Sequence, residues 1–301
     1  MQIRALVLTP SLAVLAVIGC GGPDKPANKP TDAVTVTAQP DAAAAAPAVA
    51  DAAAHAEHSV DTGKSHAHAG PPHWSYTEAP DKWGDLSGDW TTCKTGKSQS
   101  PIDIPAGVQK GKLSPIAFSY KPFPLEIFNN GHTVQAKAVA GNTITAGPTA
   151  NDKYDLLQIH AHAPSEHTLD KKPLDAEIHF VHKNAAGALA VVGVLLKKGK
   201  ENAALKAYFE NAPGEVSEGP KPVAGATVDL APLVGGKPSY YSYSGSLTTP
   251  PCSEGVSWYV LAQPVEISEA QLKKFQDATK GGPTNRPPQP LGTRALVQFK
   301  P

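Results

Sequence analysis

Aromatic residues are confined to one part of this chain, and their distribution limits where a folded core can form. All 4 Trp, 8 Tyr and 7 Phe of the 301 residues lie beyond Pro71. From Gly21 to about Gly70 the chain is rich in Ala, Pro, Asp and Thr, with almost no large apolar residue. Such a stretch buries too little surface to offset the entropy of ordering it. We therefore predict a disordered tether over residues 20–70 and one folded domain over residues 71–301.

The first residues have the pattern of an export signal over residues 1–19. Arg4 precedes the largely apolar stretch Ala5–Ile18, which is shorter than the roughly 20 residues that a membrane span needs. The stretch ends in Val17-Ile18-Gly19-Cys20, which resembles the bacterial lipobox, where the cysteine is acylated and becomes the mature N-terminus. We expect an exported lipoprotein held on a bacterial membrane by lipid on Cys20. An ordinary cleaved leader that happens to contain a Cys is the alternative.

The compartment follows from the same residues. Gly21 stands after the cysteine in place of the aspartate associated with inner-membrane retention, which favours the outer membrane or the periplasmic or cell-surface side. The tether carries His55, His58, His66 and His68, and short histidine tracts can collect divalent metal. We favour the simpler interpretation of these four residues as solvated polar groups.

Charge and composition exclude some partners and favour a β-rich fold. Lys+Arg and Asp+Glu are both 27, so no electrostatic footprint for nucleic acid or an anionic surface is present. The 30 Pro and 26 Gly argue against long helices, and 3 Cys are too few for a disulfide scaffold. The oligomeric state stays open.

We predict a β-rich α+β domain built on a large central sheet. The run Leu189–Leu196 is continuously apolar, as expected of a strand covered on both faces. Helix signals occur at Asn202–Glu210 and at Glu269–Thr279, where Ser268 and Gln271 form a capping box. The other predicted strands are Thr143–Thr145, Glu177–His182 and Trp258–Ile267.

Three histidines stand on two predicted strands. Side chains alternate between the faces of a strand, so His160 and His162 share one face, while Ile159 and Ala161 point the other way. His179 lies on the equivalent face of the next strand and would complete a cluster if the two strands pair. Three imidazoles with one open position are typical of catalytic zinc.

Two polar neighbours strengthen this interpretation. Gln158 lies two residues before His160, and Glu177 two before His179, where each could accept the second N–H of a ligand. His167 and His182 are nearby, but His182 has the wrong parity and His167 follows Pro164 in a turn, so we interpret both as structural.

These residues occur together with further motifs in a fixed order. The motifs are His73-Trp-Ser-Tyr76, Gln99-Ser-Pro-Ile-Asp103, Asn129-Asn-Gly-His132, Pro164-Ser-Glu-His167, Gly245-Ser-Leu-Thr-Thr-Pro-Pro251, Trp258 and Asn285-Arg-Pro-Pro-Gln-Pro290. Taken in this order, the set strongly resembles the α-class carbonic anhydrases and spans essentially the whole domain after the tether. Ala163-Pro164 directly after His162 is similar to the bacterial branch of that class.

The resemblance implies a twisted, mostly antiparallel sheet of about ten strands and a zinc ion (Zn²⁺) held by His160, His162 and His179. It implies reversible hydration of carbon dioxide to bicarbonate and a proton by zinc-bound hydroxide. Thr248 would orient that hydroxide through Glu166, and Asn285 would join Gln158 and Glu177 in orienting the ligands. His132 would shuttle the proton.

The remaining roles also rest on the resemblance alone. Tyr76, Asn130 and Gln135 would order the waters that carry the proton, and Gln135 stands where many relatives have Asn. Cys93 and Cys252 match a disulfide of the bacterial branch, with two free thiols as the alternative. The residues that would contact carbon dioxide or bicarbonate are Val181, Val191, Leu247, Thr249, Val256 and Trp258.

Three other functions are weighed against hydration. A catalytically silent binding module would typically lack a zinc ligand, and none is missing here. A zinc-storing lipoprotein would need neither Thr248 with Glu166 nor His132. A zinc ester hydrolase differs only in substrate, and weak ester cleavage is an expected side reaction.

Overall fold

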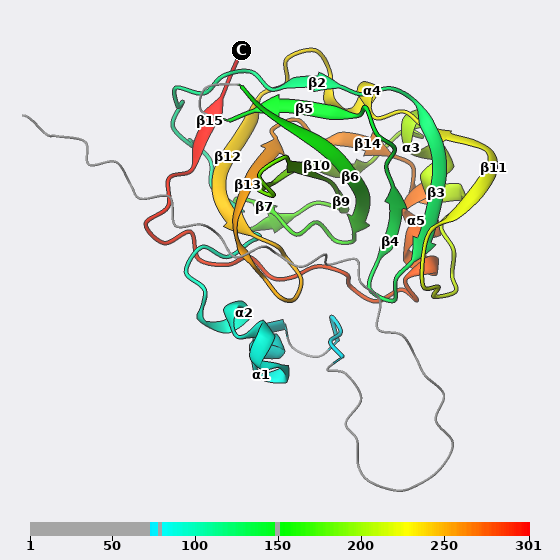
Figure 1. The fold of residues 1–301 in the computed structure, drawn as a ribbon, viewed down its shortest axis with the longest axis horizontal. Coiled ribbons are helices and arrows are strands. Elements are labelled where there is room, and N and C mark those ends of the chain that lie inside the picture. Colours follow the sequence, from blue (N-terminus) through cyan, green and yellow to red (C-terminus); the bar gives the residue numbers. More distant parts are fainter. Residues whose placement is uncertain (1–72, 78–79, 148–150) are drawn as a thin grey trace, which may run out of the picture. The chain divides into compact units, whose positions relative to one another are not determined.

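The computed structural model describes residues 73–77, 80–147 and 151–301 (Figure 1). The predicted leader, the lipidated Cys20 and the tether therefore lie outside the described residues. Five α-helices occur in the described part: α1 Trp83–Leu86, α2 Thr92–Thr95, α3 Ala203–Glu210, α4 Ala231–Val234 and α5 Glu269–Ala278, with 3-10 turns at Pro80–Lys82 and Gly88–Trp90. None of the helices in these ranges is long and apolar enough to cross a membrane.

Fifteen strands make up the rest of the regular structure in the described ranges. They are β1 Asp103–Ile104, β2 Ala117–Ser119, β3 Phe123–Asn129, β4 Val134–Lys137, β5 Thr143–Ala146, β6 Asp152–His162, β7 Thr168–Leu169, β8 Lys172–Pro173, β9 Ala176–Asn184, β10 Leu189–Lys198, β11 Lys221–Val228, β12 Tyr240–Ser246, β13 Glu254–Leu261, β14 Val265–Ile267 and β15 Val297–Phe299.

Twelve of these strands form one large mixed sheet, as the sequence predicts. Its main path runs β11-β3-β4-β6-β9-β10-β13-β12-β15, with β2 and β5 attached beside β6 and β14 beside β10 (Figure 1). Most neighbours are antiparallel, and β10 pairs in parallel with both β13 and β14. The strands β1, β7 and β8 form a separate small sheet.

Both faces of the large sheet are buried, and β10 shows why its sequence is continuously apolar. Val192 and Val194 face a core that also contains buried side chains of α3 and α5. Val191 and Leu195 face a second core on the other side, which includes Trp258. The prediction of a strand covered on both faces is confirmed.

The two predicted helices begin where their capping residues stand. The Asn202 side chain caps α3, and Ser268 with Gln271 forms the predicted capping box of α5. The single strand predicted over Trp258–Ile267 is wrong, because the structure ends β13 at Leu261 and begins β14 at Val265. Pro264 lies in the interruption and has no N–H for a sheet ladder.

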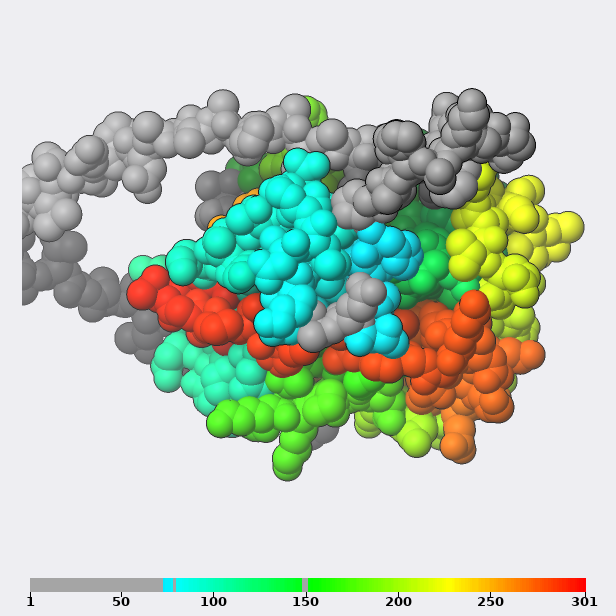
Figure 2. Space-filling view, turned by 90° about the horizontal axis from the view of Figure 1, so that it is seen from below, coloured from blue at the N-terminus to red at the C-terminus, as the bar shows by residue number. Residues whose placement is uncertain are grey.

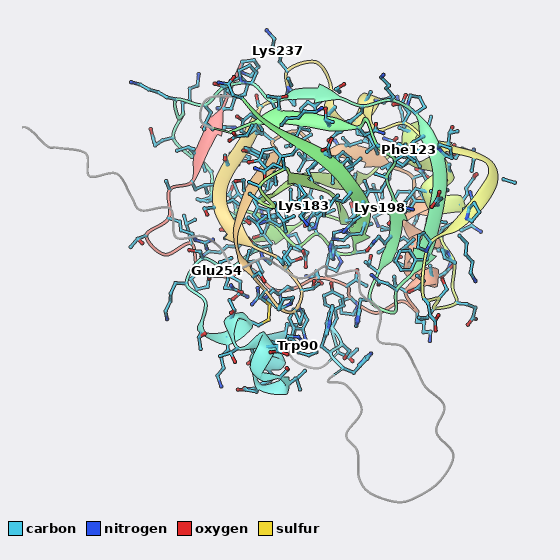
Figure 3. The ribbon with its side chains drawn as sticks, in the orientation of Figure 1. Trp90, Phe123, Lys183, Lys198, Lys237 and Glu254 are labelled. Carbon is cyan, nitrogen blue, oxygen red and sulfur yellow. A yellow bond between two sulfur atoms is a disulfide. The ribbon has the colours of Figure 1, made fainter. Side chains whose placement is uncertain are left out.

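A third apolar cluster joins the N-terminal segment to the body of the domain. Trp74, Trp83 and the two cysteines Cys93 and Cys252 are buried together, and Trp90 packs against them (Figure 3). Residues at the start of the described chain also lie against the C-terminal segment, since the Gln289 N–H donates to the Pro101 carbonyl at 2.7 Å (Figure 2). This packing places the N-terminal aromatic residues close to the C-terminal loop.

Candidate active site

Three imidazoles meet on β6 and β9 at the second core of the sheet. The strands pair in antiparallel register with His160 opposite His179, which confirms the expected pairing. The ring centroids of His160, His162 and His179 lie 4.7–5.1 Å apart. One ligand atom from each lies within 4.8 Å of the other two. Strand alternation explains the arrangement, because Ile159 and Ala161 belong to the opposite core.

Each of the three rings is oriented through its other nitrogen. His160 Nδ1 pairs with Gln158 Oε1 at 2.8 Å, and His179 Nε2 pairs with Glu177 Oε1 at 3.0 Å. These are the two neighbours that the sequence pattern predicted. A ligating histidine is held in this way when its second nitrogen donates to a fixed acceptor.

The third acceptor differs from the expected one. His162 Nδ1 hydrogen-bonds to the backbone carbonyl of Thr284, so the prediction of Asn285 for this role is wrong. The Thr284 hydroxyl also accepts from the Ala163 N–H at 3.0 Å, which fixes this loop against the end of β6. A carbonyl group is common to every residue, so side-chain type alone does not reveal which position supplies it.

The environment keeps all three imidazoles neutral near pH 7. Burial lowers the pKa of His162 to about 4, and it also lowers the pKa of His160 and of His179. Neutral imidazole is the form that binds metal. The Nε2 atom of His162 is buried and has no hydrogen-bond partner among the described residues.

Glu177 is the most heavily hydrogen-bonded carboxylate of the site. It accepts from the N–H groups of Glu166 and His167 at 3.0 and 2.8 Å, and its other oxygen pairs with His167 Nδ1 at 2.8 Å as well as with His179. Burial opposes its charge, but His167 and His179 hold the pKa of Glu177 well below its usual range. His167 in turn pairs with the Tyr243 hydroxyl at 2.7 Å. His167 therefore supports Glu177.

Glu166 lies directly beside the imidazole cluster. One of its oxygens, Oε2, is 3.6 Å from His162 Nε2, and the other accepts the Arg286 N–H at 2.8 Å. Burial raises the pKa of Glu166 to about 7, while His179, the Arg286 N–H and a hydrogen bond from the Thr248 side chain lower it. The structure therefore brings Thr248 and Glu166 together, although 82 residues separate them in the sequence (248 − 166).

An apolar wall adjoins the three histidines. Val181, Val191, Val256 and Trp258 are buried in one cluster, and Leu247 packs against it. Strand register explains the grouping, because Val191 stands opposite Val181 on one side and Trp258 on the other. The Trp258 ring lies 4.9 Å from the His179 ring, so the wall reaches the imidazole cluster. Thr249, at the neighbouring turn, accepts the Cys252 N–H at 2.8 Å.

His132 stands on the loop between β3 and β4, and its ring lies flat against Trp74. The centroids are 3.7 Å apart with an interplanar angle of 6°. The Asn130 side chain accepts the backbone N–H groups of His132 and Thr133 at 3.0 and 2.9 Å, which fixes this turn. Burial, followed by the nearby His73, lowers the pKa of His132 to about 4.

The other two residues expected to order water also lie around the cluster. Gln135 on β4 stands opposite His160 in the sheet. The Tyr76 ring is 6.4 Å from the His162 ring, and its hydroxyl is buried without a hydrogen-bond partner among the described residues. Burial and the nearby Glu166 raise the pKa of Tyr76 well above its usual range.

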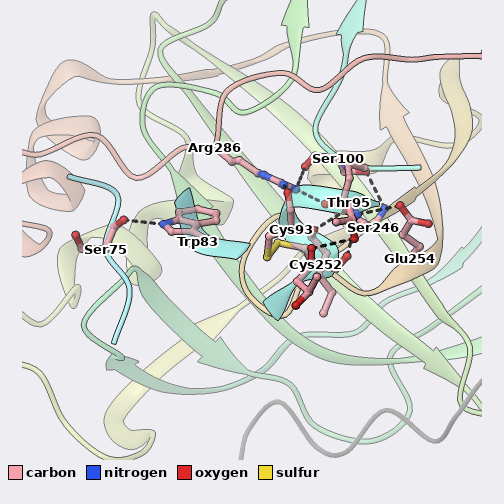
Figure 4. The surroundings of a disulfide bond; sticks show 12 residues. Ser75, Trp83, Cys93, Thr95, Ser100, Ser246, Cys252, Glu254 and Arg286 are labelled. Atoms are coloured by element: carbon pink, nitrogen blue, oxygen red, sulfur yellow. Dashed lines mark hydrogen bonds between the residues drawn. A yellow bond between two sulfur atoms is a disulfide. The ribbon is translucent and has the colours of Figure 1, made fainter. Parts of the chain in front are cut away.

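The Cys93–Cys252 disulfide forms beside the site (Figure 4). The buried Arg286 guanidinium donates to the Cys93 and Ser100 carbonyls and to Gln99 Oε1 at 2.8–2.9 Å. The same residue holds Glu166 through its backbone. Sequence reasoning quoted the motif that contains Arg286 but missed this role, which connects three segments far apart in the chain.

The sheet and its three-histidine centre define a class of protein. A buried set of three neutral imidazoles, each with an oriented second nitrogen, is typical of β-sheet enzymes whose catalytic metal is held by histidines. Comparison with known proteins narrows this class.

Residues 78–300 match the family model described as eukaryotic-type carbonic anhydrase. Carbonic anhydrase from Klebsiella pneumoniae is 43% identical over 230 residues, which cover 75% of this chain and 91% of that protein. The Neisseria gonorrhoeae enzyme is 40% identical over 235 residues, with 77% and 90% covered. The solved structure of the α-carbonic anhydrase of Thermovibrio ammonificans with the inhibitor sulfanilamide has a TM-score of 0.70 and 40% identity, covering 76% of this chain and 100% of that one.

The chain therefore belongs to the eukaryotic-type carbonic anhydrase family, and it is an enzyme of that class. Zinc-dependent hydration of carbon dioxide is the activity that the family implies.

Proposed function

We propose that His160, His162 and His179 hold a catalytic zinc ion and that the residues around them carry out carbon dioxide hydration. The observation that carries the proposal is the buried, unpartnered Nε2 of His162, which faces two further imidazoles. A polar atom of this kind is costly unless something binds it. The donor set fits zinc, because three neutral nitrogens suit this cation and leave a fourth position free.

When bound, zinc would lower the pKa of a coordinated water from about 15.7 to about 7 and so supply a nucleophile at neutral pH. The protein's own part in this step is orientation. Glu166 is fixed by the Arg286 N–H and lies within reach of the Thr248 hydroxyl. If Thr248 donates its proton to Glu166, its oxygen can only accept a hydrogen bond from the nucleophile, and the nucleophile's lone pair is directed toward the substrate carbon.

Carbon dioxide itself is apolar and binds by exclusion of water. The wall of Val181, Val191, Val256 and Trp258, with Leu247, offers the substrate a dry surface next to the imidazole cluster. Thr249 lies at the adjoining turn, where its hydroxyl could contact bicarbonate as it forms. Weak ester hydrolysis at the same centre would follow from the same nucleophile.

Each turnover also releases a proton, which must leave the buried site. An imidazole is suited to this task near neutral pH. We assign the transfer to His132, with water ordered by Tyr76, Asn130 and Gln135. The position of His132 on a partly exposed loop beside the aromatic cluster supports this assignment.

The residues present argue against the alternatives. A storage site would not require Glu166 to be fixed beside the ligands, and a silent relative would not retain three oriented imidazoles. The activity test is stopped-flow hydration of carbon dioxide by the purified protein, with and without a zinc chelator and sulfanilamide. We expect activity that both reagents abolish. Activity that survives full removal of zinc would overturn the proposal.

We further propose that lipid on Cys20 anchors the domain to the outer membrane through residues 20–70. The lipobox-like sequence before Cys20 supports this proposal. Cys20→Ala should move the protein from the membrane fraction to the soluble fraction. Unchanged fractionation would rule out the anchor.

A further inference from the structure

A second histidine lies next to His132 on its outer side. The rings of His73 and His132 have centroids 5.6 Å apart and are tilted by 33°. His73 is exposed, whereas His132 is only partly accessible. The sequence analysis used His73 only as part of a motif and gave it no function.

His132 is held too firmly to carry a proton far by itself. Its ring is stacked on Trp74, which is 9% exposed and packs edge-on against Trp83 and Tyr76 at 4.8 and 5.2 Å. Its backbone is fixed by Asn130. A proton that reaches this ring therefore needs a neighbouring group that can take it onward.

The electrostatics favour rapid transfer out of His132. Burial and the adjacent His73 lower the pKa of His132 to about 4, so its protonated form is short-lived near neutral pH. Such a group conducts protons but stores few of them. An exposed imidazole beside it supplies the contact with bulk solvent that His132 lacks.

We propose that His73 is the outer member of a two-imidazole relay, in which His132 passes each proton to His73 and His73 passes it to a solvent base. This inference rests on the proposed role of His132.

The transfer balances without any further reactant. A ring nitrogen of protonated His132 gives its proton to a bridging water, and that water gives a different proton to a free ring nitrogen of His73. The centroid separation leaves room for one such water. His132 returns to its neutral form, and His73 loses its proton to buffer.

The test compares His73→Gln, His132→Ala and the double variant with the wild-type protein. Glutamine keeps hydrogen-bonding capacity but carries no proton near neutral pH. Lys82→Gln is the matched control, because Lys82 is an exposed cation of the same segment whose ammonium lies 3.5 Å from Asp81. The readouts are kcat, kcat/KM and zinc content, at low buffer concentration and with saturating imidazole.

We expect His73→Gln to lower kcat at low buffer by roughly fivefold, a modest part of what proton-transfer groups contribute. Its kcat/KM, zinc content and melting temperature should match wild type, and imidazole should restore kcat. In the His132→Ala background the same change should cause no further loss, because the two residues act in series. Lys82→Gln should leave kcat unchanged.

Three results would overturn the relay: a wild-type kcat for both His73→Gln and His73→Asn, a loss that multiplies with that of His132→Ala, or a loss that imidazole does not restore. The multiplying result would indicate two independent routes, and the unrestored one a structural role. A failure of the proposed function would look different, because the wild-type protein would then be inactive or His132→Ala would itself be without effect.

Discussion

The backbone N–H of Arg286 donates to Glu166 at 2.8 Å, so the carboxylate beside the imidazole cluster is fixed by a loop from the far end of the chain. The same loop supplies the Thr284 carbonyl that orients His162. Two parts of the site therefore depend on one short segment. That segment is anchored by the Arg286 side chain, whose acceptors come from the N-terminal part of the domain.

Arg286→Met should destabilise the protein by roughly 3 kcal/mol or more, because it leaves three buried acceptors without a donor. Arg294→Met is the matched control. Arg294 also donates to backbone carbonyls but is only half-buried, so the loss should be roughly 1 kcal/mol. Urea unfolding at pH 7.5 measures both. Equal losses in the two variants would contradict the anchoring role.

Thr248→Val removes the hydroxyl and keeps the volume of the side chain. We expect kcat/KM to fall by about 100-fold, as when one positioned hydrogen-bonding group is removed from an active site. Zinc content and stability should stay close to wild type, since Thr248 is not a proposed ligand. Stopped-flow assays and metal analysis on the same samples check this. An unchanged kcat/KM would remove Thr248 from the mechanism.

The disulfide joins residues 159 positions apart in the sequence. Cys93→Ala combined with Cys252→Ala should cost up to about 5 kcal/mol by the chain-entropy estimate. Denaturant unfolding of the double variant, and of the wild type with and without a reducing agent, measures the loss. If neither reduction nor substitution lowers the unfolding midpoint, the bond does not stabilise this domain.

His182 gives the protein a stability that depends on pH. It is buried against Tyr120, with its Nε2 2.9 Å from the tyrosine hydroxyl. Burial lowers the pKa of His182 to about 4, whereas an unfolded histidine titrates near 6.5. The unfolded state therefore takes up the proton first, and the stability contributed above pH 6.5 is lost as the pH falls toward 4.

Between about pH 7.5 and pH 5 this residue should remove about 2 kcal/mol of unfolding free energy. His182→Gln should lack that part of the pH dependence, whatever its stability at pH 7.5. Urea unfolding at the two pH values measures the difference for each protein. The same slope in variant and wild type would show that His182 does not titrate as inferred.

The sequence predicts the parts of the site that depend on strand alternation. His160, His162 and Gln158 share a face because their spacing is two, and the apolar run at Leu189–Leu196 indicates a covered strand that the structure confirms as β10. Contacts made by backbone groups are harder to predict. The Thr284 carbonyl and the Arg286 N–H leave no mark in residue type, so a motif match placed the acceptor on Asn285, one position away.

Contacts between distant loops are also beyond pattern analysis. Nothing in the spacing of Trp74 and His132 indicates that their rings stack, because that contact depends on how the N-terminal segment packs on the domain. The one-turn helices α1 and α2 are too short to produce a periodic signal. The family resemblance located these residues but did not describe their contacts.

The zinc content of His162→Ala, measured by elemental analysis beside the wild-type protein, tests the central claim most directly. The account predicts one zinc per wild-type chain and loss of zinc from the variant, with His182→Gln as a control that retains the metal. Full zinc occupancy in His162→Ala would contradict the proposed three-histidine site.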